Sequence, residues 1–220
     1  MVKNIVLVSG KLQSGKNTFT DLVIDNLREY GRWKIDFDYF AKSVKDQSKD
    51  IFHPLITYLN EVSEKYNIPE IHTSEHNWYE EKNTITRILL QTYGTEIFRD
   101  MIDTDHWAKI LRNRMMERDE DILFITDVRF KSEMKLICDK SPYILNYRTV
   151  NPSYNILKLR IERNTYERNT SGVFVHPSEI DLDDYNNWDE MVYNDGTMED
   201  LKEKARVMTN TIIRRFYGKV

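Results

Sequence analysis

Residues 5–18 read IVLVSGKLQSGKNT, and this stretch decides the fold. Its first four residues form a short, continuous apolar run that is mostly β-branched, which predicts a strand buried on both faces of a parallel sheet. Gly10 and Gly15 follow, five residues apart, and Lys16 comes directly after the second glycine. A strand, a loop with this spacing and then a helix is the arrangement that binds nucleotide phosphates.

The residue types in this loop have a physical reason. Glycines allow the backbone to fold tightly, so that several N–H groups point into one concavity. The new helix adds its positive end, and Lys16 can reach the β- and γ-phosphates. A glycine-rich turn with an exposed lysine is the alternative interpretation. The residue after the lysine is normally Ser or Thr, whose hydroxyl binds Mg²⁺, but here it is Asn17, with Thr18 following. An amide oxygen can still ligate a hard cation or its water, so the inner shell of the metal stays open.

The pattern outside this loop predicts an α/β fold. Apolar residues at helical spacing from Phe19 to Tyr30 predict a helix that Gly31 ends. Strands alternating with helices indicate βαβ units, hence a parallel sheet with helices on both faces in three layers. We expect one domain over residues 1–220, without repeats or linkers. The other expected elements are strands at 34–40, 122–125, 143–147, 156–161 and 191–193, helices at 41–52, 54–66, 85–93, 107–115, 132–139 and 201–216, and polar, aperiodic stretches at 67–83 and 163–189.

The composition excludes several classes of protein. The 220 residues carry 32 Lys and Arg against 36 Asp and Glu, a net charge of −4, which argues against a nucleic-acid coat or a polybasic membrane binder. No apolar run approaches the ~18 residues of a membrane span, and the N-terminal run is too short for a signal peptide. The single cysteine, Cys138, excludes an internal disulfide framework and a cysteine-rich zinc site. We therefore expect a cytoplasmic protein with neither nucleic-acid polymer nor membrane as partner.

Asp127 and Arg129 follow the second buried strand run, at 122–125. A carboxylate and a nearby arginine at the carboxyl end of a strand suit Mg²⁺ and a second phosphorylated substrate. Motor and switch NTPases commonly place a glutamate or a water-positioning residue beside this aspartate, whereas Val128 stands here. The alternatives are a turn residue for Asp127 and a solvated surface charge for Arg129.

Six ordered pieces of the sequence resemble a known family. They are SGKLQSGKNT at 9–18, FAKSVKD at 40–46, RILLQTYGTEIFRD at 87–100 with Trp107 beyond it, FITDVRF at 124–130, HPSE at 176–179 and VYNDGTMEDL at 192–201. Over most of its length the chain resembles the phage-type deoxynucleoside monophosphate kinases, a branch of the P-loop nucleoside monophosphate kinase group. Members often carry Asp or Asn in place of the loop Ser or Thr, as Asn17 does here.

The resemblance implies transfer of the γ-phosphoryl group of ATP to a deoxynucleoside 5′-monophosphate, with Mg²⁺ as cofactor. It implies the P-loop NTPase fold with a helical acceptor-binding region at about 41–118 and a lid-like segment at about 163–189. The partners would be ATP and the monophosphate, and the protein would be a monomer or a homodimer. If the chain is viral, its compartment would be the cytoplasm of the host.

The resemblance also implies roles for single residues. Lys16 would bridge to the transferring group, Asp127 and Asn17 would hold Mg²⁺, and Arg129 would grip the acceptor phosphate. Arg163 and Arg168 would be catalytic arginines of the lid. Contacts to ATP are expected from Gly10, Lys11, Gln13, Ser14, Gly15, Lys16, Asn17, Thr18, Asn194 and Gly196. Contacts to the acceptor are expected from Lys42, Arg87, Gln91, Arg99, Trp107 and Arg129.

Each of these residues has a simpler interpretation. Arg87 and Gln91 suit an exposed helix face, Trp107 a core aromatic, and residues 194–196 an ordinary turn. The lid arginines and Lys42 suit solvated charge. His176 suits a hydrogen-bonded structural histidine, and Glu179 receives no role.

Two other functions stay open. One is a kinase of another small phosphorylated metabolite, such as phosphomevalonate or dephospho-coenzyme A. A base-stacking aromatic and an amide would instead favour a nucleotide acceptor, and Gln91, Trp78 and Trp107 are candidates. The other is a nucleotide-binding switch or ATPase subunit, which the missing glutamate beside Asp127 disfavours.

Overall fold

The computed structural model describes residues 2–69, 72–74, 76–81, 83–163 and 176–218. The chain divides into two compact units. We call residues 1–39 and 112–220 the sheet unit and residues 40–111 the helical unit. Among the described residues, no helix combines the length and the apolar character that crossing a bilayer needs.

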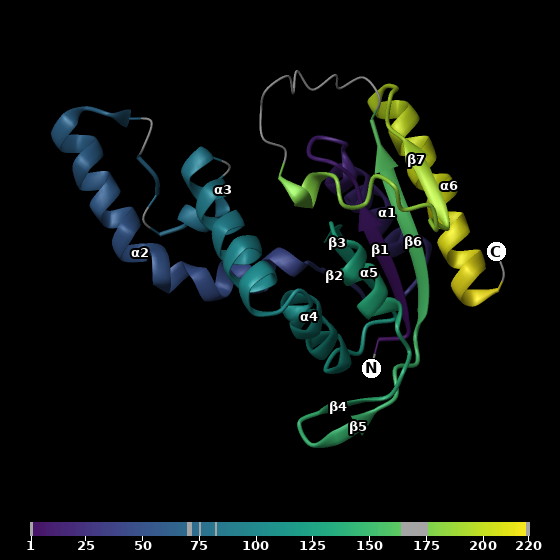
Figure 1. Cartoon of the computed structure of the whole chain (residues 1–220). Helices are drawn as coiled ribbons and strands as arrows, with labels where there is room; N and C mark the ends of the chain where they lie inside the picture. The colour runs from purple at the N-terminus through teal and green to yellow at the C-terminus, as the bar shows by residue number, and fades with distance from the viewer. Residues whose placement is uncertain (1, 70–71, 75, 82, 164–175, 219–220) are drawn as a thin grey trace. The chain divides into compact units, whose positions relative to one another are not determined.

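The sheet unit is built on a parallel sheet with the strand order β2-β3-β1-β6-β7, flanked by helices (Figure 1). In its centre Val6 lies opposite Phe124 on one neighbour and Leu157 on the other. The predicted α/β fold with a parallel sheet is confirmed. The strands are β1 (Asn4–Ser9), β2 (Ile35–Asp38), β3 (Ile122–Val128), β6 (Asn155–Glu162) and β7 (Glu190–Tyr193).

Strand β1 is buried on both faces, as its continuous apolar run predicts. Successive side chains of a strand point to opposite faces. Val6 and Val8 belong to a core cluster with side chains of α1 (Lys16–Tyr30) and α6 (Met198–Tyr217), while Ile5 and Leu7 are equally buried. A strand without a solvent-facing side fits only inside a sheet that is covered on both faces.

The helix ends follow the predicted local signals. The N–H of Gly31 donates to the carbonyl of Leu27 at the end of α1. At the start of α6, the side chain of Thr197 accepts from the N–H of Asp200 and the Asp200 carboxylate accepts from the N–H of Thr197, which forms a capping box. α5 (Lys131–Cys138) matches the helix expected at 132–139.

Residues 143–150 differ from the prediction of one strand. They form an antiparallel hairpin of β4 (Tyr143–Leu145) and β5 (Arg148–Val150). Asn146 and Tyr147 make the two-residue turn with φ of 49° and 62°. Such turns need positive φ at both positions and usually signal it with Asn-Gly, which this sequence lacks.

The helical unit also differs from the prediction. The two helices predicted at 41–52 and 54–66 are one continuous helix, α2 (Phe40–Tyr66), with Pro54 inside it. Proline removes one backbone hydrogen bond and usually kinks or ends a helix, but α2 continues through Pro54. The helix predicted at 85–93 is α3 (Thr84–Gln91), and a π-helix, η3 (Thr92–Ile102), continues it. The remaining helices are η2 (Trp78–Glu80), inside the stretch predicted as a loop, and α4 (His106–Met116).

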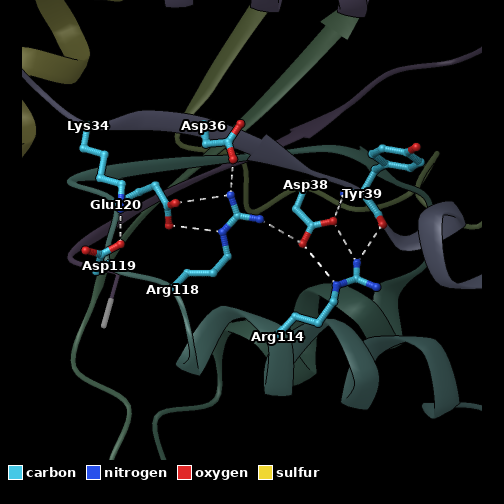
Figure 2. A network of polar contacts seen from close by, with 8 residues as sticks. All are labelled: Lys34, Asp36, Asp38, Tyr39, Arg114, Arg118, Asp119 and Glu120. Carbon is cyan, nitrogen blue, oxygen red and sulfur yellow. Dashed lines mark hydrogen bonds and ion pairs between the residues drawn. The ribbon is translucent and has the colours of Figure 1, made fainter.

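A network of ion pairs fixes the end of β2 (Figure 2). The Asp38 carboxylate is 1% exposed and accepts from Arg114 twice, with Nη2–Oδ1 at 2.8 Å and Nε–Oδ2 at 3.2 Å. Arg114 also donates to the backbone oxygen of Tyr39 at 3.1 Å. Arg118 binds Asp36 and Glu120 beside it. The paired geometry matches the planar fork of arginine, so this network joins the end of β2 to the last turn of α4.

Residues 40–111 fall inside the region predicted to be helical and to bind an acceptor, at about 41–118. Their helical structure is confirmed. That they bind an acceptor, and that the chain works as one kinase domain, stay predictions.

Candidate active site

The loop between β1 and α1 depends on its two glycines. A Cβ atom at Gly10 would lie 2.6 Å from Ser14 Oγ and 2.7 Å from the backbone oxygen of Ile161, both far inside van der Waals contact. Gly15 has φ +86°, and a Cβ there would overlap the side-chain amide nitrogen of Asn194. The backbone therefore curves as a phosphate-binding loop requires.

The same loop is braced from inside and outside. The N–H of Ser14 donates to the carbonyl of Lys11 at 3.1 Å, and Asn194 Nδ2 donates to the carbonyl of Ser14 at 2.9 Å. Ser14 Oγ is buried without a hydrogen-bond partner among the described residues. A buried hydroxyl of this kind, inside a curved loop at a helix start, suits an anionic ligand.

Lys16 begins α1 in a neighbourhood of charged groups. Burial lowers the pKa of Lys16, and the nearby Arg129 cation lowers it further, while Asp127 and Glu179 oppose both effects. Arg160 lowers this pKa as well. The cations Lys16, Arg129 and Arg160 therefore lie near one another, and two carboxylates compensate part of their charge. Bound phosphate groups would stabilise such an excess of positive charge.

Arg129 is held by a residue that the sequence left without a role. Its Nη1 lies 2.8 Å from Oε1 of Glu179, whose side chain is 3% exposed. The other carboxylate oxygen of Glu179 accepts from the N–H of Leu12 in the phosphate loop at 3.3 Å. The position of Glu179 in the HPSE segment was the one signal for it, and no local pattern showed its partners.

Arg160 is a second residue that sequence reasoning missed. It lies in β6, is buried, and donates from Nη1 to Ser9 Oγ at 2.9 Å. Ser9 Oγ in turn donates to the carbonyl of Val128 at 2.9 Å. This chain of contacts ties the carboxyl ends of β6, β1 and β3 together. Arg160 lies in a strand run, ILKLRI, that also carries Lys158, so a charged residue there was the available signal, because a buried charge needs partners.

His176 has a local structural role, as the simpler interpretation expects. It is buried, its Nδ1 lies 2.8 Å from Ser178 Oγ, and it accepts from the N–H of Ser178. These contacts cap the short helix η4 (Pro177–Glu179). The cap fixes the backbone that carries Glu179.

The predicted acceptor residues other than Arg129 all lie in the helical unit. Lys42 and Arg87 are exposed, Gln91 is half-buried one turn after Arg87 on α3, and Arg99 is buried. Trp107 is 3% exposed and its Nε1 donates to the carbonyl of Gly94 at 2.7 Å, which favours a core role for its ring. A contact of any of them with an acceptor stays a prediction.

Trp78, the other tryptophan considered for base stacking, is buried in the same unit. It packs edge-on against Phe52, and its Nε1 donates to the carbonyl of Lys49. Its ring therefore belongs to the core of the helical unit.

The remaining predicted residues divide as follows. Lys11, Gln13, Asn17 and Thr18 are exposed on the loop and the first turn of α1, and Gly196 is exposed before α6. Arg163 is exposed directly after β6, and Arg168 lies outside the described residues, so the lid stays a prediction. In the described part of the chain, no group of three or more His, Cys, Asp or Glu could hold a metal. Mg²⁺ bound with nucleotide phosphates needs only one or two protein oxygens, and Asn17 and Asp127 have the right chemistry.

Comparison with known proteins supports membership of a kinase family. A family model described as "Deoxynucleotide monophosphate kinase" matches residues 34–151. A protein of Acanthamoeba polyphaga mimivirus, provisionally named a deoxynucleotide monophosphate kinase, is 25% identical over 208 residues, which are 90% of this chain and 91% of that relative. The crystal structure of TT1252 from Thermus thermophilus aligns over 96% of this chain and 99% of its own, with 13% identity. The TM-score of that alignment is 0.40.

Proposed function

The chain belongs to the deoxynucleotide monophosphate kinase family, and we propose that it transfers the γ-phosphoryl group of ATP to a deoxynucleoside 5′-monophosphate. The products would be ADP and the deoxynucleoside diphosphate. The family match begins at residue 34, after the phosphate loop at residues 10–18. The match and the geometry of the loop are therefore independent lines of support.

One observation carries the donor half of this proposal. Lys16 stands at the start of α1, in a loop whose two glycines cannot be replaced without overlap, and a second cation, Arg129, lies near it. Loop N–H groups, a helix start and a lysine form the site that ATP phosphates need. We propose that Gly10, Lys11, Gln13, Ser14, Gly15, Asn17 and Thr18 line it.

Phosphoryl transfer asks little covalent chemistry of a protein. It requires the donor and acceptor oxygens in line and positive charge on the equatorial oxygens of the moving group. Lys16 would supply this charge at the donor, and Arg129 would bind the acceptor phosphate with its planar fork. Asp127 and Asn17 would hold Mg²⁺, which neutralises the phosphate oxygens when it is bound.

The acceptor half rests on the family. We propose that Lys42, Arg87, Gln91 and Arg99 contribute to the monophosphate pocket, with Arg163 and Arg168 near the transferring group. Asn194 is proposed as a support of the loop, with Gly196 near the base of ATP. The single cysteine supports a cytoplasmic enzyme, and the negative net charge supports small-molecule substrates over a nucleic-acid polymer. We propose that it acts as a monomer or a homodimer.

The test is an acceptor panel. The purified protein would be incubated with ATP and Mg²⁺ alone, then with deoxynucleoside and ribonucleoside monophosphates, phosphomevalonate and dephospho-coenzyme A. We expect ADP formation to depend on a deoxynucleoside monophosphate. ADP formation that depends on a different acceptor would replace the proposed substrate class. ATP hydrolysis at the same rate without any acceptor would support the switch or ATPase function instead.

A further inference from the structure

Glu179 connects the two halves of the proposed site. One of its carboxylate oxygens binds Arg129 Nη1 at 2.8 Å, and the other accepts from the N–H of Leu12 at 3.3 Å. Leu12 lies in the loop that would bind the donor, and Arg129 is the residue that would bind the acceptor. The buried Glu179 carboxylate therefore fixes both the proposed acceptor-binding arginine and the backbone of the proposed donor loop.

The segment that carries Glu179 is itself anchored around the loop. We call residues 176–184 the acidic segment. Asp181 accepts from the backbone N–H of Lys131 at 2.6 Å, at the start of α5 and three residues after the end of β3. Asp183 binds Lys11 Nζ at 2.6 Å, and Arg160 Nη2 at 3.4 Å. Glu179 thus stands on a backbone that is held at the ends of β1, β3 and β6, so its carboxylate has a defined position.

The exposure of the two partners differs in an informative way. Glu179 is 3% exposed, whereas the Arg129 side chain is 35% exposed. Within the described residues, the pair with Glu179 is the one hydrogen bond of the Arg129 guanidinium. An arginine has five N–H donors, so a guanidinium held at one nitrogen by a carboxylate keeps further donors for a ligand. This is how a surface arginine becomes a rigid phosphate clamp.

We propose that Glu179 is a positioning residue for the acceptor: it holds the Arg129 guanidinium in the orientation that grips the monophosphate and couples that orientation to the donor loop through Leu12. The inference rests on the proposed function, because Arg129 must bind the acceptor for Glu179 to act through it. Glu179 itself touches neither substrate.

The main experiment is a double-mutant cycle on monophosphate kinetics. Glu179→Gln keeps the shape and an acceptor oxygen but loses the charge, and we expect kcat/KM for the monophosphate to fall on the order of 10- to 100-fold. KM for ATP should change less than about threefold, since Lys16 and the other loop groups remain. In an Arg129→Ala background, Glu179→Gln should lower kcat/KM for the monophosphate by less than a further factor of about three, because the arginine that Glu179 positions is gone.

Asp184→Asn is the matched control. Asp184 lies on the same acidic segment and pairs with Lys131, but its side chain is 75% exposed. We expect kcat/KM within about twofold of the wild type, as for other exposed pairs. Circular dichroism and urea unfolding of every variant would show whether Glu179→Gln folds. If it does not, Glu179→Asp enters the same cycle, where the shorter side chain should give the same selective loss on the monophosphate.

The outcomes separate the two proposals. Equal losses for ATP and monophosphate, or losses that multiply in the double variant, would show that Glu179 acts independently of Arg129 and would overturn the inference. An unchanged monophosphate kcat/KM in Glu179→Gln would overturn it as well. If the wild type transfers to no monophosphate at all, the proposed function fails first. If the wild type transfers phosphate to a monophosphate but the effects of Glu179→Gln and Arg129→Ala are independent, the proposed function stands and the positioning role of Glu179 is wrong.

Discussion

The side-chain amide of Asn194 donates a hydrogen bond to the carbonyl oxygen of Ser14 at 2.9 Å, across 180 residues of sequence. Asn194 follows the last strand of the sheet, so β7 supports the phosphate loop from outside. Its amide nitrogen fills the space beside Gly15 that any side chain would need. The curvature of this loop is therefore set by tertiary contact as well as by its own glycines.

Gly15→Ala should damage both ATP binding and stability. Gly15 has φ +86°, a backbone conformation that costs a non-glycine residue roughly 1–3 kcal/mol, and the methyl group of alanine would overlap Asn194. We expect the affinity for ATP to fall at least about tenfold, as measured by titration calorimetry, because the loop must deform. Urea unfolding should show a loss of stability in the same range.

Gly218→Ala provides the control for backbone strain alone. Gly218 has φ +77° at the end of α6, and a Cβ there would meet nothing within 4 Å. We expect about 1–2 kcal/mol lower stability and unchanged affinity for ATP. Equal affinity losses in the two variants, or none in Gly15→Ala, would contradict the assignment of this loop to nucleotide binding.

Lys16→Met should stabilise the protein when no nucleotide is bound. Burial, and then Arg129, lowers the pKa of Lys16 from the ordinary 10.5, so the charged lysine is disfavoured in the folded state. Below the lowered pKa this cost is fully present; between it and 10.5 the unfolded chain binds more protons, so wild-type stability rises with pH. Asp127 and Glu179 reduce the effect, while Arg160 adds to it.

The measurement is the difference in unfolding free energy between Lys16→Met and the wild type from pH 7 to pH 10. The difference cancels the titration of groups common to both proteins. We expect it to be positive at pH 7 and to shrink as the pH approaches 10. A difference that is negative at pH 7, or that grows with pH, would show that Lys16 is not in a charge-destabilised position.

The parts of the fold with a clear sequence pattern could be predicted, and the parts without one could not. The strand expected from the run at residues 5–8 and the helix expected at 201–216 rest on local patterns, and both elements formed. The Asn146–Tyr147 turn and the helix through Pro54 depend on context that a short window does not contain. These differences follow from tertiary structure that outweighs local preference.

The candidate site shows the same division. Residues 10–18 are contiguous, so their spacing alone predicted a phosphate loop. Arg160 and Ser9 are 151 residues apart, and Arg129 and Glu179 are 50 apart. Pairs of this kind become visible only in the folded chain, which is why the sequence did not point to Arg160 and Glu179.

Asp38→Ala should destabilise the sheet unit strongly. The buried Asp38 carboxylate accepts two hydrogen bonds from Arg114, and its removal leaves that guanidinium without its main partner (Figure 2). Because the Arg114 side chain is 26% exposed, we expect the free energy of unfolding to fall by about 3 kcal/mol, the lower end of the range for a broken buried ion pair. Urea unfolding measures this loss.

Glu203→Ala is the matched control for Asp38→Ala. Glu203 pairs with Arg206 on α6, and both side chains are mostly exposed. We expect a change below about 0.5 kcal/mol. Similar changes in the two variants would show that the network at the end of β2 contributes no more than a surface pair.

Arg129→Ala should impair use of the monophosphate and leave ATP binding nearly unchanged. Loss of a bidentate arginine–phosphate contact in a partly closed site costs about 2–4 kcal/mol, or roughly 30- to 1,000-fold in kcat/KM for the monophosphate. Arg129→Lys should recover only part of this, because a point charge cannot reproduce the fork. Separate titrations with ATP and with monophosphate check the result, and a loss confined to ATP would contradict it.

The central claim is that one phosphoryl group moves from ATP to a deoxynucleoside monophosphate. The most direct measurement uses ATP with a radioactive γ-phosphate, Mg²⁺ and the best acceptor of the panel, with Lys16→Ala as the inactive control. The account predicts that the label appears in the terminal phosphate of the deoxynucleoside diphosphate, in amounts equal to the ADP formed, and that the control transfers almost none. Label found only in inorganic phosphate, or undiminished transfer by a folded Lys16→Ala variant, would contradict it.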